Sequence, residues 1–590
     1  MAEDMNLGDL SLACAWALVD GSVRGGVRDA CLSPGSRSTP IALALARHPS
    51  IRLHVHLDER SSGFFAVGLA NASRRPVIIA CTSGTAAAEF LPAIVEASRS
   101  RIPLLALTAD RPPRLRGTGA NQTIDQVGLY GGYVRECLDL PVPETPGQES
   151  WWAQSALQAL EATRSDPVGP VHVNCPFDEP LTPSQDTTLP PPDDEHLELP
   201  RRPEAALTEE EADRLASMVS GARGAVVIGG WPSALDGEAS YWSQTLGWPV
   251  IAEPGSGARR PEESLAAGQA LLGSSAWVET HRPDVVIQVG ATPTSRATQA
   301  FVGAAERLIV ADRWHPDSDP ERHASWRLAV DADALQQALE RRRWRPAPDD
   351  WSSGWAETDT IARSGLDRFL DGIDEPFEPR IARDLAAWIP QPGTLFVGNS
   401  TPIRDLDLAM APRDGLRVMA NRGASGIDGL VSTALGIAST GPYGGRADTP
   451  PGPTVALLGD LSVLYDVGAL LWAGRTGVDL VVVVVANGGG EIFSLLPQRE
   501  LPEHRDLFVT PHRIDLAPVC AAADVGYARL DQAAALTPAL DHAVGAGGLQ
   551  VVEVVVDPVR GLELRAELRA TIEAALAVPA PPPPPHATER

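Results

Sequence analysis

The chain has 590 residues, a length that predicts three or four domains rather than a single core. Its net charge of -27 argues against a nucleic-acid partner, because phosphate contacts need a basic surface. All of its 49 basic residues are arginine, and the absence of lysine excludes a P-loop NTPase, a pyridoxal Schiff-base enzyme and a lysine-dependent aldolase.

Three features of the chain lead us to expect a soluble, cytoplasmic protein with no membrane span. The longest apolar run, Leu480–Ala486, is far shorter than the ~18 residues that a membrane span needs. The first ten residues lack the basic and apolar regions of a signal peptide. The six cysteines are scattered and form no C-x-x-C pair, so we expect reduced core thiols rather than disulfides or a zinc site.

The first region, residues 1–185, alternates apolar strands with helical segments. Several of these strands are apolar throughout, which is typical of a parallel sheet covered on both faces. The predicted strands are Ala30–Pro34, Leu53–Leu57, Pro76–Thr82, Pro103–Ala109 and Val171–Pro176.

Two more regions of the same kind follow, each after a linker rich in proline and charge. The second spans residues 205–345, with predicted strands Gly224–Gly230, Pro249–Pro254, Asp284–Gly290 and Arg307–Asp312. The third spans residues 375–578, with predicted strands Thr394–Ser400, Arg417–Gly423, Thr454–Asp460, Asp479–Asn487 and Leu549–Val556. The sequence therefore predicts three doubly wound α/β domains with parallel sheets, followed by a disordered proline-rich tail, 579–590.

Two polar residues end neighbouring strands of the third region. Asp460 ends one strand, and Asn487 ends the next after a helix-like segment. A right-handed βαβ unit places both at the carboxyl ends of parallel strands, where α/β sheets bind ligands. Their side chains and the carbonyls of Asn487–Gly490 form an all-oxygen set suited to Mg²⁺ held together with phosphates. The alternative is that both residues only cap helices.

A nicotinamide fold is poorly supported, because no G-x-G-x-x-G follows the first strand.

The segment Gly459–Ser462, "GDLS", followed by "NGGGEIF" at Asn487–Phe493, resembles the diphosphate-binding motif of thiamine diphosphate enzymes, GDG-x-NN in its general form. Leu461 replaces the usual third glycine. With this departure the chain resembles one family, the 2-succinyl-5-enolpyruvyl-6-hydroxy-3-cyclohexene-1-carboxylate synthases of menaquinone biosynthesis. The other matching stretches are Leu32–Pro40, His56–Ala70, Thr82–Ala97, Thr108–Gln126, Val171–Leu181 and Ala420–Gly436.

The resemblance implies that the cofactors are thiamine diphosphate and Mg²⁺ or Mn²⁺. The implied metal ligands are Asp460, Asn487 and Gly489, and the other implied diphosphate-binding residues are Gly459, Leu461 and Ser462.

By the same resemblance, Glu59 would be the catalytic carboxylate. It would share a proton with N1′ of the aminopyrimidine and favour the imino tautomer that deprotonates C2 of the thiazolium. Partial burial should raise its pKa. Ile427 would be the apolar wedge that bends the cofactor. Without the resemblance, the residues around Glu59 would be interpreted as a solvated turn, and Ile427 as ordinary core.

The implied enzyme is a transferase whose substrates are 2-oxoglutarate and isochorismate. Decarboxylation of the first gives a carbanion-like intermediate, which adds to the ring of the second in a 1,4-addition. Both substrates carry carboxylates, which arginine binds bidentately. The residues implied for 2-oxoglutarate are Ser400, Arg404 and Arg422. Those implied for isochorismate are Ser36, Arg37, Arg111 and Gln122. Arg296 is a further basic contact, next to Ser295 where the family carries lysine. Each arginine could instead be a surface ion-pair partner.

The family binds the pyrimidine and the diphosphate with domains of different subunits. Glu59 and Asp460 would therefore meet across the interface of a homodimer, or within a dimer of dimers. An acetolactate synthase or a 2-oxoacid decarboxylase is the closest alternative, but it would leave Arg37 and Arg404 unexplained. An inactive scaffold with the same fold and a nucleotide-binding α/β protein are the others, and the last predicts protection by ATP or NAD on melting.

The acid excess predicts adaptation to high salt. We expect the melting temperature and the activity to rise between low and molar KCl, because salt screens the repulsion among surface carboxylates. Thermal melting and initial rates across a KCl series measure this dependence. Equal stability and activity at both ends of the series would contradict the prediction.

Overall fold

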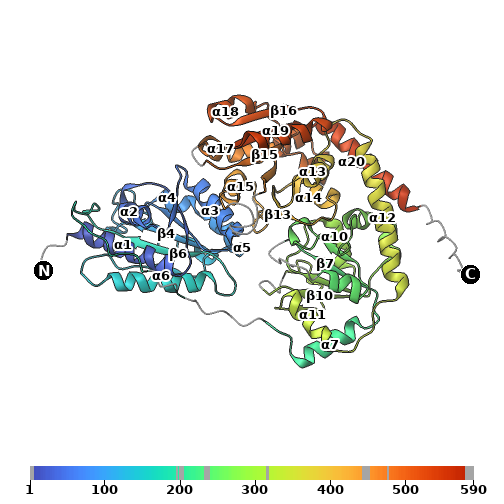
Figure 1. Cartoon of the computed structure of the whole chain (residues 1–590), viewed down its shortest axis with the longest axis horizontal. Coiled ribbons are helices and arrows are strands. Elements are labelled where there is room, and N and C mark those ends of the chain that lie inside the picture. Colours follow the sequence, from blue (N-terminus) through green and yellow to red (C-terminus); the bar gives the residue numbers. More distant parts are fainter. Residues whose placement is uncertain are drawn as a thin grey trace, which may run out of the picture.

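The computed structural model describes residues 6–193, 197, 205–230, 239–313, 318–440, 452–474 and 477–577. It contains three parallel sheets, one in each predicted region, so the predicted α/β class is confirmed. The first domain lies on one side of the molecule and the second and third domains lie on the other (Figure 1). The predicted proline-rich tail lies outside the described residues, and the domain limits stay a prediction.

The first domain is a six-stranded sheet with the strand order β2-β1-β3-β4-β6-β5. Its strands are β1 (Asp29–Leu32), β2 (Arg52–Val55), β3 (Val77–Cys81), β4 (Leu104–Asp110), β5 (Cys137–Asp139) and β6 (Val171–Pro176). Its helices are α1 (Leu7–Arg24), α2 (Thr39–Arg47), α3 (Glu59–Ser73), α4 (Thr85–Glu89), α5 (Leu91–Arg99) and α6 (Glu149–Thr163), with short turns η1 (Ser36–Ser38), η2 (Pro113–Leu115) and η3 (Gly131–Tyr133).

The second domain is a five-stranded sheet with the order β11-β10-β9-β7-β8. Its strands are β7 (Gly224–Ile228), β8 (Val250–Ala252), β9 (Val285–Val289), β10 (Arg307–Ala311) and β11 (Trp326–Leu328). Its helices are α7 (Glu209–Val219), α8 (Gly268–Leu272), α9 (Ser275–Thr280), α10 (Arg296–Gly303) and α11 (Ala332–Glu340), with the short turns η4 (Tyr241–Thr245) and η5 (Pro254–Ser256).

The third domain repeats the topology of the first, because its strand order β13-β12-β14-β15-β17-β16 follows the same pattern. Its strands are β12 (Gly393–Val397), β13 (Leu416–Met419), β14 (Thr454–Gly459), β15 (Leu480–Ala486), β16 (Gly526–Leu530) and β17 (Leu549–Val555). Its helices are α13 (Glu378–Trp388), α14 (Thr401–Ala409), α15 (Leu430–Ala438), α16 (Asp460–Tyr465), α17 (Val467–Ala473), α18 (Leu516–Ala522), α19 (Leu536–Ala546) and α20 (Pro558–Ala577), with η7 (Glu491–Leu495), η8 (Pro497–Glu500), η9 (Arg505–Val509) and η10 (Ala533–Ala535).

The sequence missed three strands, β5, β11 and β16, and each is the outermost strand of its sheet. Their residues are mostly half-buried or exposed, whereas the central strand β15 is buried except at its last residue. The other edge strands, β2, β8 and β13, were predicted, so the edge position alone does not explain the omissions. The three missed strands lack the continuous apolar run by which most of the other strands were identified. These omissions do not change the predicted fold class.

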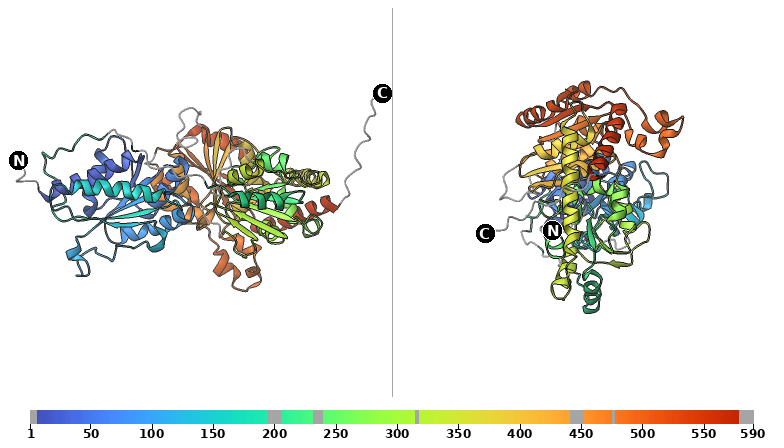
Figure 2. Two further views of the ribbon diagram at one scale, coloured as in Figure 1. Left: turned by 90° about the horizontal axis from the view of Figure 1, so that it is seen from below. Right: turned by 90° about the vertical axis from the view of Figure 1, so that its right-hand side faces the viewer.

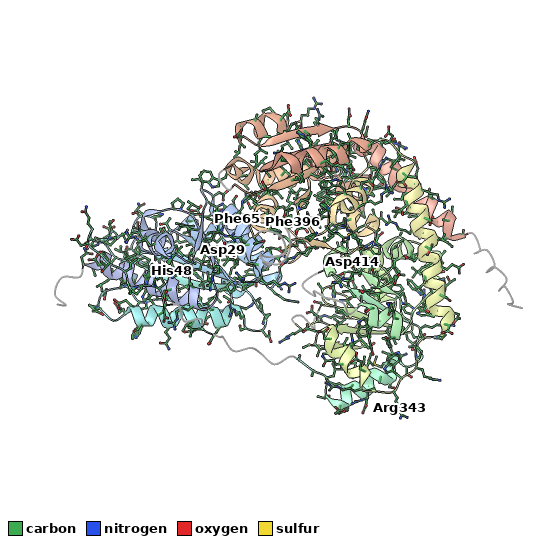
Figure 3. All side chains as sticks on the ribbon, in the orientation of Figure 1. Asp29, His48, Phe65, Arg343, Phe396 and Asp414 are labelled. Atoms are coloured by element: carbon green, nitrogen blue, oxygen red, sulfur yellow. The ribbon has the colours of Figure 1, made fainter. Side chains whose placement is uncertain are left out.

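The first and third domains share one hydrophobic core. Phe65 of α3 and Phe396 of β12 belong to the same cluster of buried side chains (Figure 3). Within it α3 packs against α15, where Gly68 faces the backbone of Thr433 and Gly436 faces the backbone of Phe65. Glycine allows this close approach, because a Cβ at either position would overlap main-chain atoms of the other helix.

Two buried ion pairs tie the second domain to its neighbours. Arg101 of the first domain donates to Asp312 at 3.1 Å, and Arg259 donates to Asp407 of α14, also at 3.1 Å. A long helix, α12 (Asp349–Asp371), runs along the outer side of the second and third domains and packs against α20 (Figures 1 and 2). The three domains are therefore joined by direct contacts as well as by their linkers.

All six cysteines are free thiols, and all but Cys137 are buried, as predicted for small core residues. Among the described residues, no helix is both long and apolar enough to cross a membrane.

The contact between α3 and α15 predicts that Gly68→Ala destabilises the protein by about 1–3 kcal/mol, since the added methyl group overlaps the Thr433 carbonyl. Chemical denaturation measures the change as a lower transition midpoint. Gly354→Ala is the matched control, because Gly354 lies within α12 with no atom within 4 Å of the added Cβ. We expect that variant to be more stable by about 0.5–1 kcal/mol. A neutral effect of Gly68→Ala would contradict the close packing.

Candidate active site

A cavity of about 520 Å³ lies at the carboxyl edge of the third sheet, and its wall is made by residues between 399 and 496. The loops after β12, β13, β14 and β15 contribute to it, as expected for the ligand edge of a doubly wound sheet. The sequence-predicted residues that line it are Ser400, Arg404, Arg422, Ile427, Gly459, Asp460, Leu461, Ser462, Asn487 and Gly489. All of the predicted residues of the third domain are thus brought together.

Asp460 organises the loop that follows the neighbouring strand. β14 and β15 are parallel neighbours, which confirms the predicted placement of Asp460 beside Asn487. The carboxylate is 3% exposed, and its Oδ2 accepts hydrogen bonds from the backbone N–H groups of Gly488 at 2.7 Å and Gly489 at 3.1 Å. Burial raises the pKa of Asp460, while His512, with Nε2 3.3 Å from Oδ2, opposes that change.

Gly489 allows the loop after β15 to lie close to the backbone of Val509. Its φ is +153°, and a Cβ there would lie 2.5 Å from the carbonyl oxygen of Val509. The loop can therefore direct its backbone at a ligand only with glycine at this position. Asn487, which precedes it, is buried and lines the same cavity.

These residues fit a metal ion that is shared with a phosphate ligand. Among the described residues, no group of three or more His, Cys, Asp or Glu side chains is placed to hold a metal alone. The cavity instead offers the Asp460 carboxylate, the Asn487 amide and the Gly489 carbonyl, a hard-oxygen set that is incomplete for Mg²⁺ without oxygens from the ligand. A diphosphate supplies such oxygens, so the donor set is consistent with Mg²⁺ and thiamine diphosphate.

Two arginines, Arg404 and Arg422, also line the cavity. The pKa of Arg404 is lowered by burial and by the nearby charges of Arg422 and Arg296. Arg422 donates to Asn399 Oδ1 at 2.8 Å and to Thr294 Oγ1 at 3.0 Å, so its fork is held by the second and third domains. Arg404 and Arg296 are exposed and Arg422 is half-buried, and a cluster of guanidinium groups of this kind favours an anionic ligand.

Ser400 has a strained backbone at this point. Its φ of 74° lies in the left-handed region, which is uncommon for a residue other than glycine. Ser400 precedes the first turn of α14, and its carbonyl oxygen accepts a hydrogen bond from Arg404 at 2.5 Å. Strain of this kind is found where a binding site fixes the chain.

Arg296 is less directly placed than the other predicted residues. It is the exposed first residue of α10 and is not part of the cavity wall, although its charge acts on Arg404. Ser295 caps α10, because its side chain accepts a hydrogen bond from the backbone N–H of Thr298. Serine therefore has a structural role at this position.

Glu59 lies in the first domain and begins α3, at the end of β2. Asp58 caps the helix by accepting a hydrogen bond from the backbone N–H of Ser61 at 3.2 Å. Burial raises the pKa of Glu59, and the charges of Asp58 and Glu89 raise it further. This is the direction predicted from the sequence. The carboxyl does not belong to the wall of the third-domain cavity.

The predicted isochorismate residues form a second group in the first domain. Arg111 donates to Ser83 Oγ and to the carbonyl oxygen of Gln122, and Gln122 in turn donates to the carbonyl of Ser83. Arg37 is buried and donates to Glu179 at 3.2 Å, and its charge acts on Arg111. Ser36 is exposed beside Arg37. Gln122 has a positive φ of 54°, so this group also contains a strained backbone.

The predicted site residues fall into two groups, which we call half-sites, and their shared role stays a prediction. The first-domain group is Glu59, Ser36, Arg37, Arg111 and Gln122, and the third-domain group lines the cavity at Asp460. Among the residues that the structure describes, none of the first domain lines this cavity.

Sequence reasoning missed several residues that line or support the cavity. Ile492, Phe493 and Leu496 form an apolar wall directly after the glycine-rich loop. They lie in a stretch that the family resemblance covers, but apolar residues carry no chemical signal of their own. Asn399 and Thr294 hold Arg422, and their role depends on contacts between domains that no local pattern reveals.

Three family models match the chain. The N-terminal TPP binding domain of thiamine pyrophosphate enzymes matches residues 14–129, their middle domain matches residues 200–397, and their C-terminal TPP binding domain matches residues 409–554. Among curated proteins, a 2-succinyl-5-enolpyruvyl-6-hydroxy-3-cyclohexene-1-carboxylate synthase of Thermobifida fusca is 42% identical over 96% of this chain and 99% of its own length. Synthases of the same name from Chloroflexus aurantiacus and Haloarcula marismortui are 40% and 37% identical, over 91% and 95% of this chain and 92% and 98% of their own lengths.

The chain belongs to this synthase family. It is therefore a thiamine diphosphate-dependent enzyme. The first-domain half-site lies within residues 14–129, and the third-domain half-site, apart from Ser400 and Arg404, lies within residues 409–554. Membership of this family of thiamine enzymes also removes the nucleotide-binding alternative.

The geometry at Asp460 predicts that Asp460→Asn weakens Mg²⁺-dependent binding of thiamine diphosphate by at least about tenfold, because the only carboxylate of the proposed donor set is lost. Isothermal titration of the cofactor with and without Mg²⁺ measures the affinity. Asp506→Asn is the matched control, since it removes the same charge from an exposed position in the neighbouring segment. Equal Mg²⁺ dependence in both variants would contradict the proposed ligand set.

Proposed function

We propose that the chain decarboxylates 2-oxoglutarate and transfers the resulting succinyl unit to isochorismate in a 1,4-addition. The product would be 2-succinyl-5-enolpyruvyl-6-hydroxy-3-cyclohexene-1-carboxylate, the compound in the names of its relatives, with release of CO2. This is a transferase reaction of menaquinone biosynthesis. The observation that carries the assignment to this chain is the pair of guanidinium groups that line the cavity, those of Arg404 and Arg422, with the charge of Arg296 acting on Arg404.

The residues that line the third-domain cavity would have different tasks. Asp460, Asn487 and Gly489 would hold Mg²⁺ or Mn²⁺ with the diphosphate, and Gly459, Leu461 and Ser462 would bind the diphosphate beside them. Ile427, which lines the same cavity, would be the apolar support for the cofactor. When bound, thiamine diphosphate supplies the nucleophilic carbon and the electron sink for decarboxylation. Glu59 holds the proton that is shared with N1′, and its raised pKa suits that task.

Recognition of the two substrates rests on arginine. Arg404 and Arg422, with Ser400, bind the distal carboxylate of 2-oxoglutarate, and each charge-assisted contact contributes roughly 1.5–3 kcal/mol. Ser36, Arg37, Arg111 and Gln122 bind isochorismate, and Arg296 adds positive charge near Arg404. A 2-oxoacid decarboxylase or acetolactate synthase acts on substrates without a distal carboxylate. An enzyme of that kind would not need two mutually repelling arginines, Arg404 and Arg422, in the cavity wall.

We propose further that the catalytic site is completed in a homodimer, in which Glu59 of one copy faces Asp460 of the other. Two observations support this arrangement. The cavity wall comes from the third domain alone. Large apolar side chains are also exposed around the two half-sites, at Val55, Leu57, Tyr465 and Leu471, with Leu57 70% exposed. Trp472 of α17 donates to the Val55 carbonyl at 3.0 Å, so these residues lie on one face. Apolar patches of this kind mark protein interfaces.

The free thiols fit a reducing compartment, and we propose the cytoplasm.

The test of this function follows isochorismate consumption by purified protein with thiamine diphosphate, Mg²⁺ and KCl. We expect consumption with 2-oxoglutarate as donor and none with pyruvate, because pyruvate has no distal carboxylate for Arg404 and Arg422. Equal rates with both donors would contradict the role of Arg404 and Arg422 in selecting the donor. No consumption with either donor, despite cofactor binding, would favour the 2-oxoacid decarboxylase or the inactive-scaffold alternative.

Within the same assay, Glu59→Gln should abolish turnover and leave binding of Mg²⁺ and diphosphate nearly unchanged. The amide keeps the shape of the carboxyl but cannot exchange a proton with the pyrimidine. Cofactor titration separates the two effects. An active Glu59→Gln variant would contradict the assigned role of Glu59.

A further inference from the structure

Glu96 connects the first domain to the cavity of the third domain. It lies in α5 and is 2% exposed. Its Oε1 accepts hydrogen bonds from the backbone N–H of Gly423 at 2.8 Å and from Ser100 Oγ at 2.6 Å. Its Oε2 accepts a hydrogen bond from the backbone N–H of Ala424 at 2.7 Å. Both oxygens of a buried carboxylate are therefore used to hold consecutive N–H groups of another domain.

The loop that Glu96 binds is fitted closely against α5. A Cβ on Gly423 would lie 2.7 Å from the Glu96 carbonyl oxygen, the Ser100 nitrogen and Ser100 Oγ. Glycine is required here because the backbone of the loop lies directly against the helix. Hydrogen bonds from backbone N–H groups to a carboxylate are charge-assisted, and removing one partner in a buried position leaves the other unsatisfied.

The same loop carries two residues of the cavity. Arg422 immediately precedes the bound N–H groups and Ile427 follows them, and both line the cavity wall. Arg422 is held at its guanidinium end by Asn399 and Thr294, and the charge of Glu96 also acts on it. The guanidinium is thus fixed by the second and third domains, whereas the backbone from which it extends is fixed by the first.

We infer that Glu96 is a positioning residue for the active site. It holds the 422–427 loop so that Arg422 and Ile427 face the cavity together. The consequence for 2-oxoglutarate rests on the proposed function, in which Arg422 binds the distal carboxylate. The consequence for the loop does not, because the hydrogen bonds are made within the chain itself.

The test uses Glu96→Gln in the full-length protein, and its first readout needs no activity. The glutamine amide has the size of the carboxyl, but its NH2 group is a hydrogen-bond donor, like the N–H groups of the loop. One loop N–H therefore loses its acceptor. Hydrogen–deuterium exchange of the peptide containing residues 421–428 should accelerate by about tenfold or more in the variant, without cofactor. Exchange in the buried strands β14 and β15 should stay as in wild type.

The second readout is a split between kinetic constants. We expect the KM for 2-oxoglutarate to rise about tenfold and the KM for isochorismate to stay within about twofold, because Arg422 loses its position and the first-domain arginines do not. Glu161→Gln is the matched control, an exposed glutamate on α6 of the same domain, and should behave as wild type in both readouts.

Three results would overturn the inference. They are unchanged exchange at residues 421–428, faster exchange throughout the third domain, and a loss of active protein with both KM values unchanged. If wild type itself fails to use 2-oxoglutarate, the proposed function fails, and exchange alone decides the role of Glu96. If Glu96→Gln does not fold, Ser100→Ala takes its place. It removes one hydrogen bond to Oε1, and exchange of the same peptide should accelerate by a smaller factor.

Discussion

The rest of the structure depends on the contact between α3 and α15, in which two glycines allow the helix backbones to touch. This contact joins buried side chains of the first and third domains in one hydrophobic cluster. α3 begins with Glu59, and α15 follows the loop that carries Arg422 and Ile427. The spacing of the two helices therefore sets the positions of both half-sites. A side chain at Gly68 or Gly436 would separate the helices and displace residues far from the substitution, because close-packed interiors transmit strain.

Electrostatics imposes a second constraint. A protein with a net charge of -27 repels dianionic substrates at long range, so the cavity needs concentrated positive charge at short range. Arg404, Arg422 and Arg296 supply it, and arginine stays charged even where burial and like charges lower its pKa. Lysine, which loses its proton more readily when buried, would be a poorer choice at these positions. High salt would also screen the long-range repulsion while affecting the buried contacts less.

Much of the fold and part of the site could be predicted from the sequence. Apolar runs such as Leu480–Ala486 identify central strands, and Asp460 and Asn487 at the ends of two adjacent strands identify the ligand edge. The edge strand β16 was missed because half its surface faces solvent. Glu96 could not be predicted, because its partners Gly423 and Ala424 lie in another domain and a glutamate in an amphipathic helix is ordinarily solvated. Ser295 shows a related limit, because its capping bond is visible only once α10 is placed.

Glu96 and Glu59 lie in the same domain but serve the reaction differently. Glu96 acts on the cavity of its own chain, through hydrogen bonds to Gly423 and Ala424. In the proposed homodimer, Glu59 acts on the cavity of the other copy. Each first domain would then contact two catalytic sites. A movement of α3 or α5 on substrate binding at one catalytic site would therefore displace the 422–427 loop at the other catalytic site. Such a shared rigid element is the physical basis that coupling between two sites requires. In that homodimer, the arrangement would give a structural reason why the pyrimidine half-site and the diphosphate half-site remain on one chain although they would belong to different catalytic centres.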